Sequence, residues 1–159
     1  MIEVIFVLQF VHQLAAAAMF GTWLGIALFM LLAHRSASTS VAAMATRLVV
    51  AVEKIVMIVA MAMAPISGFP LASAVGLSPA DEFWLVPSIA IYVVVVAGWI
   101  AAFGIEMRLR GLARKAAIKG APLSNGYRRL FRMWRVLALL ILGGMVALFV
   151  LMIWQPRQS

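Results

Sequence analysis

One histidine inside a long apolar run is the residue of this sequence best suited to chemistry. His12 lies in the run 4–33, which is built mainly from Val, Leu, Ala, Phe and Met. An ionisable side chain at such a position is a functional candidate, because placing it in hydrocarbon is costly. A neutral imidazole is a good ligand for haem iron or copper. The alternative is a neutral ring that is hydrogen-bonded to a neighbouring helix or to interfacial water.

A second ligand for a metal at His12 is not obvious. His34 is the other histidine, and it lies roughly 33 Å away if the run is one helix, so one haem cannot bridge both within a chain. The thioether of Met61 is a candidate cofactor ligand, although methionine also fills gaps in apolar packing. A copper path would use the same histidine and methionine side chains.

Charged and aromatic residues near the ends of the apolar runs give further candidates. Glu53 and Lys54 are adjacent and do not face one another on a helix. One interpretation is that Glu53 and Lys54 form an interfacial pair that marks the membrane edge. The other is that Glu53 takes part in proton transfer. Glu106 has Arg110 four residues later as a plausible ion-pair partner. Trp99 lies inside an apolar run and is expected to line a pocket, whereas the remaining membrane aromatics are expected at the interfaces: Trp84, Tyr92, Trp134 and Trp154.

Two prolines interrupt the second apolar run. The segment Pro65–Pro70 includes Ser67 and Gly68. Proline lacks an N–H and disfavours a helical residue before it, so we expect the helix to break here, near the outer surface. The carbonyls that this frees must find partners among neighbouring helices or water. The segment lines a cavity, or it is a tilted helix end.

The elements that position these residues follow from composition and run length. Apolar residues make up 66% of the chain and charged residues 11%, which excludes a water-soluble globule. Four runs each approach the ~20 residues that a membrane helix needs. We therefore predict one all-α membrane domain, residues 1–159, as a four-transmembrane-helix bundle with spans at about 4–33, 55–74, 83–105 and 136–154.

The hairpin between the third and fourth spans is predicted to have regular structure. Residues 106–119 continue the third helix, 120–126 form a turn, and 127–135 lead into the fourth span. Small residues at Gly21 and Gly25, at Gly98 and Ala102, and at Gly143 and Gly144 indicate close helix packing, within the chain first and in a homo-oligomer second.

The distribution of basic residues predicts the orientation of the bundle. Eleven of the 13 Lys and Arg residues lie in the segments between the first and second or the third and fourth spans, and Lys54 lies at the inner edge of the second span. The positive-inside rule puts these segments in the cytoplasm and both termini, with Asp81 and Arg157, in the periplasm. The net charge of +8 then reflects a multi-pass protein of a bacterial inner membrane, and nucleic acid is not an expected partner. Five arginines of the basic hairpin are candidate ligands of anionic lipid headgroups, or they determine topology alone: Arg108, Arg110, Arg128, Arg129 and Arg132.

Absent residue types exclude several chemistries. The chain has no cysteine, so disulfides, thiolate zinc sites and cysteine nucleophiles are ruled out. It also lacks a glycine-rich phosphate loop, a His-Glu-x-x-His pattern and a Ser/His/Asp set.

Four motifs, in order along nearly the whole chain, carry a family resemblance. They are Phe10-Val11-His12 before an Ala-rich stretch, Pro65-x-Ser67-Gly68, the run from Tyr127 to Trp134, and Leu151-Met152-x-x-Gln155-Pro156. The sequence resembles an uncharacterised bacterial family described as predicted integral membrane proteins, a domain of unknown function. The resemblance implies four membrane helices and no established activity.

A looser likeness extends to two better-known groups of similar size. They are the HemJ-type membrane protoporphyrinogen oxidases and the CopD-type copper-resistance domains. In the HemJ group a histidine of the first helix is associated with haem, and His12 matches it. The lysine that precedes this histidine in that group is absent here.

Three functional hypotheses result. The first is a small inner-membrane protein that binds b-type haem through His12 and acts in or beside a redox process. The second is a non-catalytic accessory subunit that packs against other membrane subunits. The third is copper handling through His12 and methionines.

Overall fold

The protein is a bundle of long helices. The computed structural model describes residues 2–78 and 82–154, and these contain no strand. Pro79, Asp81 and the closing residues 155–159 lie outside the described residues. The elements are α1 (Ile2–Arg35), α2 (Thr39–Val52), the π-helix η1 (Glu53–Met57), α3 (Ile58–Ala74), α4 (Leu85–Lys119) and α5 (Asn125–Trp154). Because α2, η1 and α3 follow one another without a gap, they form a single continuous helix.

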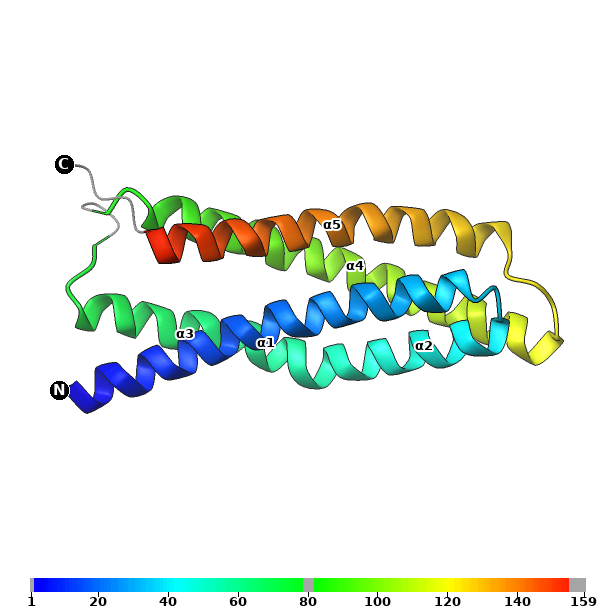
Figure 1. Ribbon diagram of the computed structural model, residues 1–159, viewed down its shortest axis with the longest axis horizontal. Helices are drawn as coiled ribbons and strands as arrows, with labels where there is room; N and C mark the ends of the chain where they lie inside the picture. Colours follow the sequence, from blue (N-terminus) through cyan, green and yellow to red (C-terminus); the bar gives the residue numbers. More distant parts are fainter. Residues whose placement is uncertain (1, 79–81, 155–159) are drawn as a thin grey trace.

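The four helical rods run alternately up and down (Figure 1). At one end α1 begins, α5 ends and α3 connects to α4; we call this the terminal end. At the other, α1 meets α2 and α4 meets α5; we call this the hairpin end. α1 packs mainly along α3, and α4 packs mainly along α5 and α2.

The prediction of an all-α bundle with four membrane-spanning helices is confirmed. Four rods are long and apolar enough to cross a membrane: Ile2–Arg35, Thr39–Ala74, Leu85–Lys119 and Asn125–Trp154. The helix that contains the second predicted span, 55–74, begins earlier along the chain, at Thr39, where the Ser38 side chain accepts a hydrogen bond from the backbone N–H of Val41.

The predicted hairpin between the third and fourth spans is also confirmed. α4 continues to Lys119 and α5 begins at Asn125. Gly120 ends α4 with a φ of 58°, a left-handed conformation that glycine adopts without steric cost.

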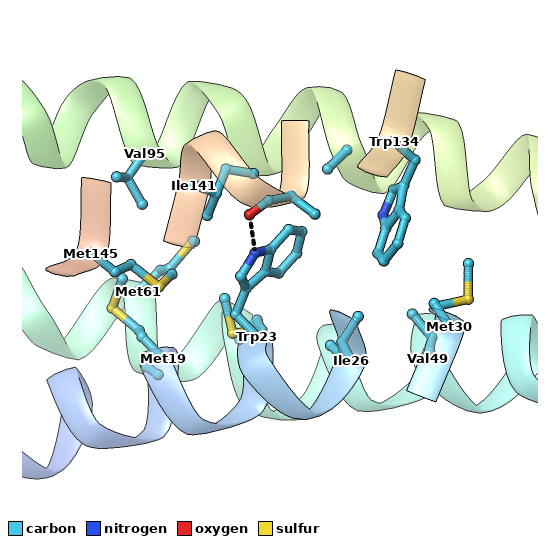
Figure 2. Packing of buried hydrophobic residues seen from close by; sticks show 14 of the residues in the cluster. Met19, Trp23, Ile26, Met30, Val49, Met61, Val95, Trp134, Ile141 and Met145 are labelled. Atoms are coloured by element: carbon cyan, nitrogen blue, oxygen red, sulfur yellow. Dashed lines mark hydrogen bonds between the residues drawn. The ribbon is translucent and has the colours of Figure 1, made fainter. Parts of the chain in front are cut away.

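A column of large side chains fills the bundle. Trp23, Met30, Leu109 and Trp134 are all essentially inaccessible. Figure 2 shows Met19, Trp23, Ile26 and Met30 projecting from α1 into this core. Trp23 Nε1 donates to the carbonyl of Ala138 at 3.2 Å, which ties α1 to α5 across it.

The glycines divide between packing sites and the outer surface. A β-carbon added at Gly144 would lie 2.6 Å from Val95 Cγ2, and one at Gly98 would lie 3.2 Å from Ile141 Cγ1. These glycines therefore bring α4 and α5 together, as predicted. The prediction of internal packing is wrong for Gly21 and Gly25, because both are exposed and nothing lies within 4 Å of their added β-carbons.

The predicted helix break at the two prolines is wrong. α3 continues through Pro65 and Pro70. Pro65 cannot donate to the carbonyl of Met61 four residues earlier. The hydroxyl of Tyr92, on α4, donates to that carbonyl instead. The freed acceptor thus has a partner inside the protein, which removes the reason for the helix to end.

We expect Tyr92→Phe to destabilise the bundle by about 1–3 kcal/mol, because it leaves the Met61 carbonyl buried without a donor. In a Pro65→Ala background the new N–H of residue 65 can supply that bond, so the same substitution should cost much less. Thermal unfolding of the four proteins of this cycle in detergent measures the coupling. Equal costs of Tyr92→Phe in both backgrounds would contradict this account of the proline.

Candidate functional site

His12 is held against α3 at the terminal end of the bundle. Its Nδ1 lies 2.9 Å from the carbonyl oxygen of Ala64 and 3.4 Å from Oγ of Ser67. The Ser67 hydroxyl itself donates to the carbonyl of Met63 at 2.6 Å, which fixes its position. Sequence candidates from two separate apolar runs, His12 and Ser67, are therefore brought together.

Gly68 lets the two helices approach at this point. A β-carbon added there would lie 2.9 Å from Cε1 and 3.1 Å from Nδ1 of His12. Both distances are shorter than ordinary van der Waals contact, so any larger residue would displace the imidazole. The His12 ring therefore packs directly against the backbone of Gly68.

These contacts determine which ring nitrogen of His12 is available. A carbonyl oxygen only accepts, so Nδ1 carries the hydrogen and donates it to Ala64. In the neutral ring, Nε2 then keeps a free lone pair. No hydrogen bond reaches Nε2 from residues 2–78 or 82–154. Metal-binding histidines commonly have this arrangement, with one nitrogen bound to a carbonyl and the other facing the metal.

Met61, the second predicted cofactor ligand, faces the core. Its side chain is 6% exposed, and Figure 2 shows it at the same level as Met19 and Met145. Within the described residues no three His, Asp or Glu side chains lie close enough to hold a metal ion. A groove of about 450 Å³ lies between α1 and α5 and does not include His12 or Met61. Its lining is entirely apolar: Phe20 on α1 and Val146, Phe149, Val150, Ile153 and Trp154 on α5.

A second polar site lies inside the bundle. Glu53 on η1 and Glu106 on α4 are both 0% exposed. Trp99 Nε1 donates to Oε1 of Glu53 at 3.1 Å, and Trp134 Nε1 donates to Oε1 of Glu106 at 2.6 Å. Each carboxyl group therefore accepts one indole hydrogen bond in a setting where lipid and core offer no water.

The two carboxyl groups also interact directly with each other. Their second oxygens, Oε2 of Glu53 and Oε2 of Glu106, are buried and have no donor. Two ionised carboxylates have no hydrogen to place between them, so a pair of this kind is unfavourable unless it gains a proton or a cation. We refer to Glu53 and Glu106 together as the carboxyl pair.

Among the residues that the structure describes, no basic side chain compensates the carboxyl pair. Lys54 points outward and is exposed, so it forms no interfacial pair with Glu53. The predicted ion pair between Glu106 and Arg110 is also absent from the described residues, since the recorded partner of Glu106 is Trp134.

Glu53 starts the π-helix Glu53–Met57, in which the N–H of Ile58 bonds to the carbonyl of Glu53. Such wide turns are rare and occur frequently at functional sites. They let the chain stay helical while changing how a side chain is aimed.

Of the two tryptophans that bind the carboxyl pair, the sequence indicates a buried site for only one. Trp99 was expected to line a pocket, and it contacts Glu53. Trp134 was expected at the interface, and this is wrong: it is 1% exposed and binds Glu106. The spacing of Trp99 and Glu106 does indicate that the two side chains share a site. They are seven residues apart, which is two turns on one face of α4.

The predicted headgroup ligands lie toward the hairpin end. Arg108, Arg128, Arg129 and Arg132 are exposed and Arg110 is half-buried. His34 lies at the same end, where its ring stacks on Phe131 at a centroid distance of 3.9 Å. It is therefore an aromatic packing partner far from His12.

The comparisons with known proteins give one match. A family described as "predicted integral membrane protein" (DUF2269) matches residues 6–156. No curated protein matches the chain. No solved structure matches it either.

We expect Trp134→Phe to destabilise the bundle by about 1.5–3 kcal/mol, because it removes a hydrogen bond to a buried carboxyl group. Trp154→Phe is the matched control, since Trp154 is 74% exposed. Thermal unfolding in detergent measures both. Equal unfolding temperatures for the two variants would contradict a structural role of the Trp134 indole N–H.

Proposed function

Because the chain belongs to this family of predicted integral membrane proteins, whose description records a location and no activity, we propose a function from the geometry. The protein binds b-type haem in the membrane, with Nε2 of His12 as an axial ligand, and acts in or beside a redox process. The observation that carries this proposal is the hydrogen bond from Nδ1 of His12 to the carbonyl of Ala64.

That bond prepares His12 for ligation in two ways. It selects the tautomer whose Nε2 lone pair is free, and it orients the ring. It also raises the basicity of the ligating nitrogen, because the carbonyl draws on the Nδ1 hydrogen. Gly68 and Ser67 hold the ring on its other sides.

Haem suits this surrounding better than a bare metal ion. A protein site for copper needs several side-chain ligands. The described residues offer no cluster of three His, Asp or Glu, and Met61, the predicted thioether ligand, is buried in the core beside Met19 and Met145. A porphyrin brings its own equatorial nitrogens and needs only axial ligands from the chain. Its apolar ring is compatible with the apolar residues around His12, and when bound it would supply a one-electron redox centre.

The test is the visible absorption spectrum of detergent-purified protein from haem-supplied cells, before and after dithionite. We expect a Soret band that sharpens on reduction and is lost in His12→Ala. Gly68→Ala should weaken it severalfold, because the added methyl group displaces the imidazole.

His34→Ala is the matched control, because it removes the other histidine of α1 and should leave the band unchanged. Gly25→Ala is the control for Gly68→Ala, since its added methyl group meets nothing within 4 Å. A featureless wild-type spectrum would refute the haem proposal. Bound copper without a Soret band would support metal handling in its place.

We also propose an orientation in a bacterial inner membrane, with the hairpin end in the cytoplasm and the termini in the periplasm. The support is the concentration of Lys and Arg in the segments at the hairpin end. There the exposed arginines can contact anionic headgroups, each contributing about 1 kcal/mol near the membrane surface.

The absence of cysteine makes this orientation easy to test. Val75→Cys lies at the terminal end and Lys119→Cys at the hairpin end, and both positions are exposed. In intact cells whose outer membrane is permeabilised, a membrane-impermeant maleimide should label Val75→Cys alone. After lysis both should be labelled. The reverse pattern in cells would overturn the orientation.

The second candidate is a non-catalytic accessory subunit. The exposed small residues Ala17, Gly21 and Gly25 favour it, because such an edge of α1 lets another membrane helix, from a partner or a second copy, approach closely. This function predicts a colourless protein that co-purifies with a partner and tolerates His12→Ala.

A further inference from the structure

We propose that the carboxyl pair is a proton-binding site, in which one proton is shared between Oε2 of Glu53 and Oε2 of Glu106. The geometry that carries this is the burial of both side chains together with the lack of any donor for both Oε2 atoms. The site is separate from His12, so it stands or falls independently of haem binding.

The hydrogen-bond inventory of the pair leaves room for one more hydrogen. Each Oε1 accepts an indole N–H, from Trp99 and from Trp134. The two Oε2 atoms have no partner, yet the carboxyl groups interact. One proton placed between them gives each a partner and leaves a single negative charge on the pair, with both indole dipoles directed at it. This is how closely spaced carboxyl groups behave in general, because two like charges at contact distance in an apolar site cannot both persist.

The same inventory argues against a metal cation. Ca²⁺ and Mg²⁺ take six or more oxygen ligands, whereas in this pair only the two Oε2 atoms are without a hydrogen-bond partner. The indole N–H groups that surround the pair present positive hydrogens. They stabilise the single negative charge that remains when one proton is shared by the pair.

Charged groups on the packed helices do not neutralise the pair. Both carboxyl groups are buried, and they interact with each other and with the two indoles. No cation is among the groups that interact with them. On α1 the titratable and charged groups toward this end are His34, whose ring faces Phe131, and Arg35, which is exposed. The basic groups of the remaining elements at this level are Arg47 on α2, Lys54 on η1, Arg108 and Arg110 on α4, and Arg132 and Arg135 on α5; all are exposed except the half-buried Arg110.

The pair lies nearer to the hairpin end of the apolar runs than to the terminal end. Glu106 directly follows the apolar run 83–105, and Glu53 precedes the run 55–74. Both therefore lie on the hairpin side of the apolar belt, which the proposed orientation assigns to the cytoplasm.

The test is infrared spectroscopy of purified protein in lipid at neutral pH. The C=O stretch of a protonated carboxylic acid is separate from the bands of carboxylates, and it shifts to lower frequency in D₂O. We expect this band in the wild type. We expect its loss in Glu53→Gln and in Glu106→Gln, because the amide N–H of the glutamine then donates to the remaining carboxylate in place of the proton.

Glu3→Gln is the matched control, since Glu3 is exposed near the start of α1, and it should keep the band. Circular dichroism checks that each glutamine variant folds; if one does not, the other decides. Absence of the band from the wild type at neutral pH overturns the proposal, as does its persistence in a folded glutamine variant. Disappearance of the wild-type band on adding sodium or lithium also overturns it, because the ligand is then a metal cation.

Discussion

A polar group buried inside a membrane bundle must find its hydrogen-bond partner within the protein, and this constraint shapes the arrangement of the whole bundle. Four aromatic side chains meet it by donating from one helix to an acceptor on another. Trp23 bonds to the Ala138 carbonyl, Tyr92 to the Met61 carbonyl, and Trp99 and Trp134 to Glu53 and Glu106. An indole or phenol can do this because its body packs like a hydrocarbon and only its tip is polar. The bundle is thus held in register by directional bonds between helices as well as by apolar packing.

The number of helices could be predicted from the sequence, because the length of each apolar run is dictated by the thickness of the hydrocarbon layer. Run length says less about where a helix ends. α2 is helical from Thr39 although it lies before the apolar run, since its inner face carries small residues such as Ala42 and Ala45 that pack inside the bundle. Proline was misleading for a related reason. Its local cost is fixed, but whether a helix breaks depends on a donor from another element, here Tyr92, which no local pattern reveals.

The candidate sites were predictable to different degrees. His12 stood out because an imidazole is rare in an apolar run, and the structure places it against Ala64 and Ser67, with a hydrogen bond to a neighbouring helix that leaves its ligand role a prediction. The carboxyl pair was harder, because Glu53 and Glu106 each lie next to basic residues and at the edge of a run, where a surface position is the usual expectation. Only the three-dimensional arrangement brings them face to face, and it depends on Trp134 turning inward. In a membrane protein a tryptophan near a run's end is usually interfacial, so its burial is informative only when its acceptor is known.

The length of α4 has a mechanical consequence. Its 35 residues extend about 52 Å, well beyond the ~30 Å of hydrocarbon, and the excess, residues 106–119, lies at the hairpin end. At that end α5 begins at Asn125, soon after Gly120, so the segment outside the apolar layer is a pair of antiparallel helices rather than a long loop. A tag or a soluble domain spliced helix-to-helix into 120–124 would therefore be carried on a short rigid stalk and would keep a fixed angle to the membrane plane. A chain of 159 residues, too small to be aligned easily as single particles, thereby offers a natural point for attaching a rigid fiducial.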